Sequence, residues 1–240
     1  MKAQQRHQLK QNDFAQTVAR VSTVVVEERQ RVLAGVLIAV VAAAAIGGYF
    51  VWRAHTRNQA GALFAAAMAI SESAISPAPT VPGAAQAAGT YPTATAKQEA
   101  AIEAFRKVAN AYPSSPDGLA AAYQVASGLA ALGRTADAEK AYEDVISRAG
   151  ASIYGPAARM GLADVLAASG QYDRAIKEYT DLAAQRDGAL PVDGILVELA
   201  RTYVKAGKAA EARATFKRVV DEFPASSYGA EARQQIALLG

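Results

Sequence analysis

The sequence predicts an all-α protein in which a single N-terminal transmembrane helix precedes a solenoid of helical hairpins. Two observations support this fold class. An uncharged, apolar run occupies residues 32–52, and three glycines, Gly133, Gly170 and Gly207, stand 37 residues apart with the same pattern of neighbours around each. A repeat of this length is typical of stacked helix pairs, because one pair cannot bury its apolar face alone.

The first segment, residues 1–31, is a basic tail. It carries six basic and three acidic residues, for a net charge of +3, whereas residues 32–240 carry nineteen of each sign. A neutral remainder lacks the field that attracts phosphate groups, so we expect no nucleic-acid partner. Within the tail, helical spacing of Phe14, Val18, Val21 and Val25 predicts an amphipathic helix. It either contacts the membrane or a cytoplasmic partner, or extends the spanning helix.

The uncharged run 32–52 is long enough to cross a hydrocarbon core at ~1.5 Å per residue. A cleaved signal peptide is the alternative, but its apolar region is normally ~7–15 residues and its leader is short. Six basic residues precede the run, whereas only Arg53 and Arg57 follow it before Lys97. Since basic residues resist translocation, we expect the N-terminus in the cytoplasm and the C-terminal domain in the periplasm, with the span in the bacterial inner membrane and in contact with its lipid.

Small residues recur every four positions within the span and share one helix face. Such a stripe lets membrane helices approach closely, which indicates a homo-oligomer or docking on another membrane protein; a merely alanine-rich span is the alternative. The stripe consists of Gly35, Ala39, Ala43 and Gly47.

Residues 53–75 are predicted as the first periplasmic helix, and residues 76–95 form a Pro/Ala-rich linker. Extending the repeat register back one period places Ala101, Phe105 and Val108 in the second helix of an earlier hairpin. The first helix of that hairpin would fall within the linker. We therefore expect the alanine-rich segment 59–70 to act as a displaced first helix.

The repeat domain is predicted over residues 96–240. In each unit, glycine ends the first helix in the left-handed conformation, and an alanine and an aromatic residue follow at fixed positions in the second helix. Pro156 is expected to open a helix at its first position, where no amide donor is needed. The predicted repeats are 119–150, 156–187 and 193–224, with a capping helix at 228–239.

This pattern resembles the tetratricopeptide repeat (TPR), and the junctions YPSSPDG (112–118) and FPASSYG (223–229) look like those of bacterial envelope TPR proteins. The order of tail, span and repeats resembles the TPR family ancillary to the Sec translocon. That resemblance implies a scaffold whose partners are translocon subunits, periplasmic chaperones or exported polypeptides. Two alternatives are a self-associating structural subunit of a membrane machine and a coordinator like the TPR partner of the Tol–Pal system, which residues 211–239 also resemble.

The TPR resemblance implies that the first helix of each hairpin lines a groove. Domains that clamp a terminal carboxylate carry basic residues and asparagine where this chain has other residues, so hydrophobic or extended segments are the expected ligands. Arg201 and Lys205 would supply a small basic contact. The candidate groove residues are Tyr123, Ser127, Met160, Asp164, Val197, Arg201 and Lys205.

The sequence offers little for catalysis. Its two histidines, His7 and His55, lie in the tail and beside the span, and there is no cysteine. No zinc motif of the His-Glu-x-x-His type and no phosphate-binding glycine loop occurs. We therefore expect no enzymatic activity, no cofactor and no metal site.

Overall fold

The computed structural model describes residues 29–78, 85–185 and 188–240. The amphipathic helix predicted in the tail lies outside these residues. The chain divides into two compact units, Met1–Thr56 and Arg57–Gly240. A long helix, α2 (Arg29–Glu72), begins in the first unit and ends in the second.

The part of α2 in the first unit is strongly apolar. Its most apolar window has a mean hydropathy of 2.3, and none of that window is buried inside the protein. A Cβ atom added to Gly35 or Gly47 would meet nothing within 4 Å, so the small-residue face is open. One N-terminal helix is therefore long and apolar enough to span a membrane, as the fold-class prediction required.

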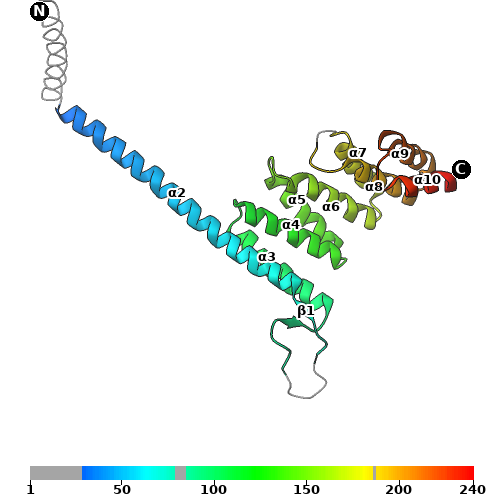
Figure 1. Ribbon diagram of the computed structural model, residues 1–240, viewed down its shortest axis with the longest axis horizontal. Helices are drawn as coiled ribbons and strands as arrows, with labels where there is room; N and C mark the ends of the chain where they lie inside the picture. The colour runs from blue at the N-terminus through cyan, green and yellow to red at the C-terminus, as the bar shows by residue number, and fades with distance from the viewer. Residues whose placement is uncertain (1–28, 79–84, 186–187) are drawn as a thin grey trace, which may run out of the picture. The chain divides into compact units, whose positions relative to one another are not determined.

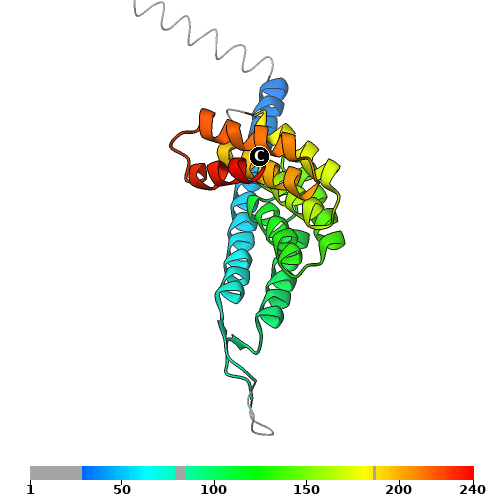
Figure 2. The same cartoon turned by 90° about the vertical axis from the view of Figure 1, so that its right-hand side faces the viewer.

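The second unit is a stack of helical hairpins (Figure 1). α4 pairs with α5, α6 with α7 and α8 with α9, and each hairpin packs on the next. In Figure 2 the stack is seen from its C-terminal end, with α9 and α10 in front. The predicted solenoid is confirmed. Its helices are α3 (Ala94–Ala111), α4 (Pro116–Ala131), α5 (Thr135–Arg148), α6 (Tyr154–Ala168), α7 (Tyr172–Ala183), α8 (Val192–Lys205), α9 (Ala209–Glu222) and α10 (Gly229–Leu238).

The three repeat glycines end their helices as predicted. Gly133, Gly170 and Gly207 have φ values of 71°, 78° and 73°, in the left-handed region that a side chain disfavours. The amide that follows each glycine donates to a carbonyl five residues back; that of Arg134, for example, donates to Leu129 at 3.0 Å. This bond satisfies a carbonyl that the end of the helix would otherwise leave free.

The start of α4 requires glycine for a different reason. The Ser115 hydroxyl accepts a hydrogen bond from the Gly118 amide at 2.9 Å and so caps the helix. A Cβ atom at Gly118 would lie 1.9 Å from the carbonyl oxygen of Tyr112, which no rotamer change relieves. In the next repeat, α6 begins at Tyr154 instead of Pro156, so the prediction for Pro156 was two residues late. Its first turn still tolerates a missing amide.

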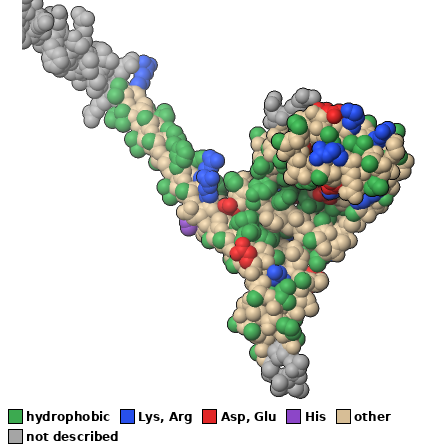
Figure 3. Space-filling view, turned by 45° about the vertical axis from the view of Figure 1, so that its right-hand side comes forward, with side chains coloured by type: hydrophobic (Ala, Val, Ile, Leu, Met, Phe, Trp, Pro, Cys, Tyr) green, Lys and Arg blue, Asp and Glu red, His purple; other side chains and the backbone are tan. Residues whose placement is uncertain are grey.

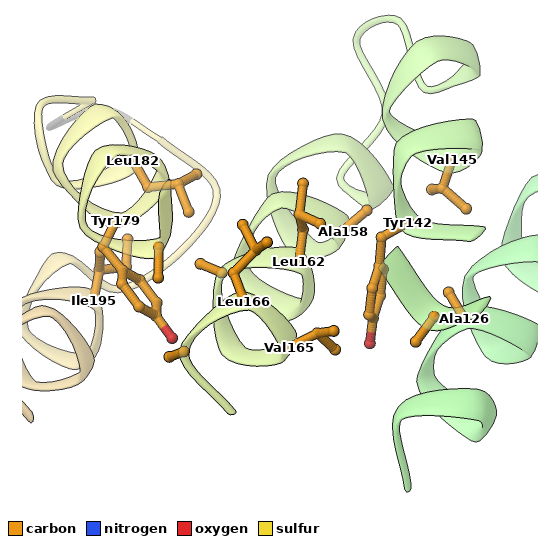
Figure 4. Close-up of a cluster of buried hydrophobic side chains, with 14 of the residues drawn as sticks. Ala126, Tyr142, Val145, Ala158, Leu162, Val165, Leu166, Tyr179, Leu182 and Ile195 are labelled. Atoms are coloured by element: carbon orange, nitrogen blue, oxygen red, sulfur yellow. The ribbon is translucent and has the colours of Figure 1, made fainter. Parts of the chain in front are cut away.

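The repeated alanines and aromatic residues form the core between hairpins. Ala138, Ala175 and Ala212 are fully buried, and the second helices contribute Tyr142, Tyr179 and Phe216, none more than 4% exposed. Figure 4 shows the two tyrosine rings packed among aliphatic side chains of α5, α6 and α7. The small residue permits close helix approach and the large one fills the space beside it.

The C-terminal part of α2 supplies the displaced first helix. The rings of Phe64 and Phe105 lie 5.5 Å apart, and the Tyr112 hydroxyl donates to Gln59 at 3.2 Å. Ala60 and Ala67 are buried. The predicted role of segment 59–70 is thereby confirmed, because it packs on α3 as a hairpin partner would.

A feature that the sequence did not predict joins the ends of the linker. Strand β1 (Ala74–Ile75) pairs in parallel with β2 (Thr90–Tyr91). The Gln86 side-chain amide reinforces this closure, donating to the Ser76 carbonyl and the Thr90 hydroxyl, both at 2.8 Å. The pairing brings the end of α2 near the start of α3, although many residues separate them in sequence.

Candidate functional site

The candidate site is the hollow face of the second unit. Figure 3 shows hydrophobic side chains gathered in this hollow. The first helices of the hairpins, α4, α6 and α8, carry the residues predicted to line it. Six of the seven predicted residues are half-buried or exposed: Tyr123, Ser127, Met160, Asp164, Arg201 and Lys205.

An aromatic cluster spans α4, α5 and α6. The half-buried ring of Tyr123 lies 6.1 Å from that of Tyr142, edge to face, and 5.6 Å from that of Tyr154. Burial, followed by the negative charge of Asp164, raises the pKa of the Tyr123 hydroxyl. It therefore stays protonated at neutral pH. Sequence reasoning selected Tyr123 and missed the two rings that flank it.

Two tyrosine hydroxyls reach the hollow face from the second helices. Tyr142 interacts with the side chain of Ser127, and Tyr179 donates a hydrogen bond to a carboxylate oxygen of Asp164. Figure 4 shows both hydroxyls on the same side of the buried layer. Burial, as the main cause, raises the pKa of Tyr142 to about 12. The pKa of Tyr179 is also raised, first by burial and then by Asp164.

These two contacts obey the repeat. Ser127 and Asp164 both stand six residues before a repeat glycine, and their tyrosine partners both stand nine after it. The third repeat has Arg201 and Phe216 at these positions. Phe216 has no hydroxyl to donate, and Arg201 finds its partners elsewhere. An alignment of the three repeats contains this signal, which sequence analysis of single positions missed.

Asp164 stands in a negative environment. Partial burial raises the pKa of its carboxyl, the Tyr179 hydrogen bond lowers it, Glu198 raises it and Lys205 lowers it. The residue keeps an exposed side chain. Among the described residues, no lysine or arginine forms an ion pair with it. Its charge is stabilised by a neutral hydroxyl instead of a cation.

Arg201 differs from its predicted role as a basic contact. Its guanidinium donates to Glu231 through two bonds of 2.8 and 2.6 Å, and to Glu198 at 2.5 Å. These carboxylates, Glu231 first, raise its pKa despite some burial. Two internal acids thus already engage its charge, and the pair with Glu231 fastens α10 to α8. Lys205 is exposed and makes no ion pair within the described residues.

The prediction that Val197 lines the groove was wrong, because its side chain is completely buried. The C-terminal cap covers this face of α8: Gly194 lies close to the ring of Tyr228, and Arg201 bonds Glu231. Val197 stands between those two contacts. Met160, at the same repeat position in α6, is partly buried and packs against the core, so it offers only part of its surface.

A cleft of about 400 Å³ lies among α5, α6 and α7 and is lined by Ile146, Leu162 and Leu166, among others. Most charges at its edge are paired: Arg174 with Glu139 at 2.6 Å, and Lys177 with Asp181 at 2.7 Å. Acidic and basic residues balance along the edge, so the cleft favours neither a positive nor a negative ligand. Within the described residues there is no cluster of three or more metal-ligating side chains.

Comparisons with known proteins agree with this architecture. Residues 26–190 match the family described as Tetratricopeptide repeat-like domain, and residues 195–226 match the Tetratricopeptide repeat. The chain therefore belongs to the Tetratricopeptide repeat-like domain family. None of the curated proteins matches it.

Several solved structures are similar. The TPR-like repeats of a putative kinesin light chain from Podosopora anserina share 20% identity, over 60% of this chain and 77% of that one, with a TM-score of 0.52. MamA shares 17% identity over 60% and 77% of the two chains, with a TM-score of 0.49. The Yersinia enterocolitica type III secretion chaperone SycD, solved with a peptide of the translocator YopD, shares 20% identity over 52% of this chain and 94% of that one, with a TM-score of 0.45. The likeness to the first supports the TPR fold.

Proposed function

We propose that this protein is a membrane-anchored scaffold of the bacterial envelope whose repeat groove binds polypeptide segments near sites of protein translocation or periplasmic folding. The observation that carries the proposal is the hollow face of α4 and α6. There, Tyr123, Ser127 and Asp164 keep accessible surface, and Tyr123 also packs against the core. Aromatic and polar groups on a concave surface are typical of protein-binding sites. A TPR fold suggests the same general role.

Membrane anchoring is the second part of the proposal. It rests on the apolar window of α2, none of which is buried, and on the excess of basic residues before it. The order of tail, span and repeats, which resembles the family ancillary to the Sec translocon, suggests the location near translocation. On this proposal the tail 1–31 is cytoplasmic, the span covers 32–52 and the domain that follows is periplasmic.

The topology is tested with two reporters fused after Gly240. Alkaline phosphatase, which is active only outside the cytoplasm, is expected to be active in intact cells, and a reporter that works only in the cytoplasm is expected to be silent. The opposite pattern would place the repeats in the cytoplasm and refute the periplasmic part.

The binding face is tested by photocrosslinking in cells that produce the full chain. A photoreactive amino acid replaces Lys205, whose charge acts on Asp164 in the groove, or Lys217 on α9, which is also an exposed lysine. Discrete adducts from position 205 with few from position 217 support the groove. Equal adducts from both, or none from position 205, would refute it.

Self-association through the span is a second candidate, favoured by the open small-residue face of α2. Two copies could pack there by close backbone approach at Gly35 and Gly47. Replacing both by isoleucine would then abolish a homo-oligomer on native gels of mildly solubilised membranes. An unchanged ladder, or no homo-oligomer in the parent protein, would argue against this role.

A further inference from the structure

The centre of the groove carries a carboxylate, Asp164, that no cation contacts directly within the described residues. Asp164 accepts a hydrogen bond from the Tyr179 hydroxyl and forms no ion pair with a described lysine or arginine. Its charge acts on Tyr123, Tyr142 and Tyr179, raising the pKa of each hydroxyl. Tyr142 lies against Gly161, one turn before Asp164 on α6, and its ring lies 6.1 Å from that of Tyr123, which places the carboxylate beside this tyrosine layer.

The nearest basic residues do not neutralise this charge. Arg201 is engaged by Glu198 and Glu231, and Glu198 itself raises the pKa of Asp164. Lys205 acts on Asp164 only through space and is exposed to solvent. Together with Lys205, these groups sum to one negative charge: three carboxylates against one guanidinium and one ammonium. An arriving cation would find an attractive field, whereas an arriving carboxylate would be repelled.

The half-buried ring of Tyr123 belongs to the same tyrosine layer. Tyr123 and Tyr154 lie 5.6 Å apart in a tilted arrangement, and both are only half-buried. The face of a phenol ring carries negative potential, which attracts an ammonium or guanidinium group within about 6 Å of the ring centre. The long methylene stem of lysine or arginine can also cover such a ring while its charged end reaches an acid.

We infer that the groove between α4 and α6 selects polypeptide segments that carry an arginine or lysine, whose stem packs on Tyr123 and whose charge pairs with Asp164. This inference rests on the proposed function, since it names the class of segment that the same groove accepts. It reverses the preference that the sequence suggested through Arg201 and Lys205, because Arg201 is already paired.

The inference is tested by titrating peptides into the full chain in a mild nonionic detergent. The peptides have blocked ends and identical Ser, Ala and Leu flanks, and differ at one central residue: arginine, lysine, citrulline or glutamate. Citrulline has the shape of arginine without its charge. We expect the arginine peptide to bind about tenfold more tightly than the citrulline peptide, and the glutamate peptide to bind most weakly.

Asp164→Asn keeps a carbonyl oxygen for the Tyr179 hydroxyl and removes the charge, so it should abolish the preference for arginine over citrulline. Asp181→Asn on α7 is the matched control, since it removes the same charge from an exposed ion pair elsewhere and should leave the preference intact. Tyr123→Leu, which keeps apolar bulk without a phenol ring, should weaken binding of the arginine peptide more than binding of the citrulline peptide. Circular dichroism verifies that each variant is folded.

Equal binding of arginine and citrulline peptides would overturn the inference, as would an equal effect of both aspartate variants, or no binding of any peptide. The proposed function has a separate readout. If position 205 still gives adducts in cells while arginine has no advantage in vitro, the groove binds polypeptides without this selectivity. If both fail, the proposed function falls as well.

Discussion

Replacing Gly161 by alanine tests how the hairpins stack. A Cβ atom at this position in α6 would lie 2.4 Å from Cζ and 2.5 Å from the hydroxyl oxygen of Tyr142. Carbon atoms in contact prefer about 3.5–4.0 Å, so the ring or the helix must shift by more than about 1 Å. Tyr142 is 4% exposed and packs within the core, which leaves its ring little room to move.

The expected loss follows from two opposing contributions. Overpacking a well-filled core costs about 1–3 kcal/mol, whereas alanine gains about 0.5–1 kcal/mol over glycine within a helix. Gly161→Ala should therefore lower the free energy of unfolding by about 1 kcal/mol, the difference between the midpoints of these two ranges. Gly194→Ala is the control, because its Cβ would lie 3.7 Å from the nearest atom, a normal contact with the Tyr228 ring. It should be neutral or stabilising.

Urea titration of the full chain in mild detergent, followed by circular dichroism of the helices, measures both variants. The double variant Gly161→Ala with Tyr142→Leu should lose less free energy of unfolding than the two single variants together, because the smaller side chain leaves space for the new methyl group. If Gly161→Ala is as stable as Gly194→Ala, the ring of Tyr142 does not lie against α6 and the stacking described above is incorrect.

Three further predictions concern the groove, the first capping turn and the C-terminal cap. The pKa of Asp164 is raised, so the folded chain holds this proton more tightly than the unfolded chain. The parent protein should therefore lose stability relative to Asp164→Asn as pH rises past about 4. Equal pH profiles of the two proteins in urea titrations would contradict this prediction. Gly118→Ala should destabilise by at least about 2 kcal/mol, whereas Gly229→Ala, three repeats later and near only the flexible Arg233 side chain, should be nearly neutral; the same titrations decide. Glu231→Gln should cost less than about 1 kcal/mol and speed amide exchange in α10, an effect that shrinks in high salt; unchanged exchange in α10 would show that its pair with α8 does not hold the cap.

The repeat itself could be predicted from sequence because its signals are local. Helical spacing and a left-handed glycine depend on a few neighbouring residues, so Gly133, Gly170 and Gly207 identified the hairpins directly. The displaced first helix followed by elimination: the register required a partner for Phe105, and an alanine-rich segment containing Phe64 was available.

The groove was harder to predict because its lining depends on contacts between distant elements. Val197 has the same repeat position as Tyr123, yet it is buried because the C-terminal cap covers α8. Arg201 pairs with Glu231, thirty residues away on a helix outside the repeat pattern. A single repeat does not encode such pairings. The tyrosine contact to Asp164 does follow the repeat, and comparing all three units position by position would have found it.

Hydrogen exchange of the full chain with and without the arginine peptide tests the central claim most directly. The account predicts slower exchange in α4 and α6, around Tyr123 and Asp164, with unchanged exchange in the outer turns of α5 and α7. Protection confined to the cleft among α5, α6 and α7, near Ile146, would contradict the account, as would no protection at saturating peptide.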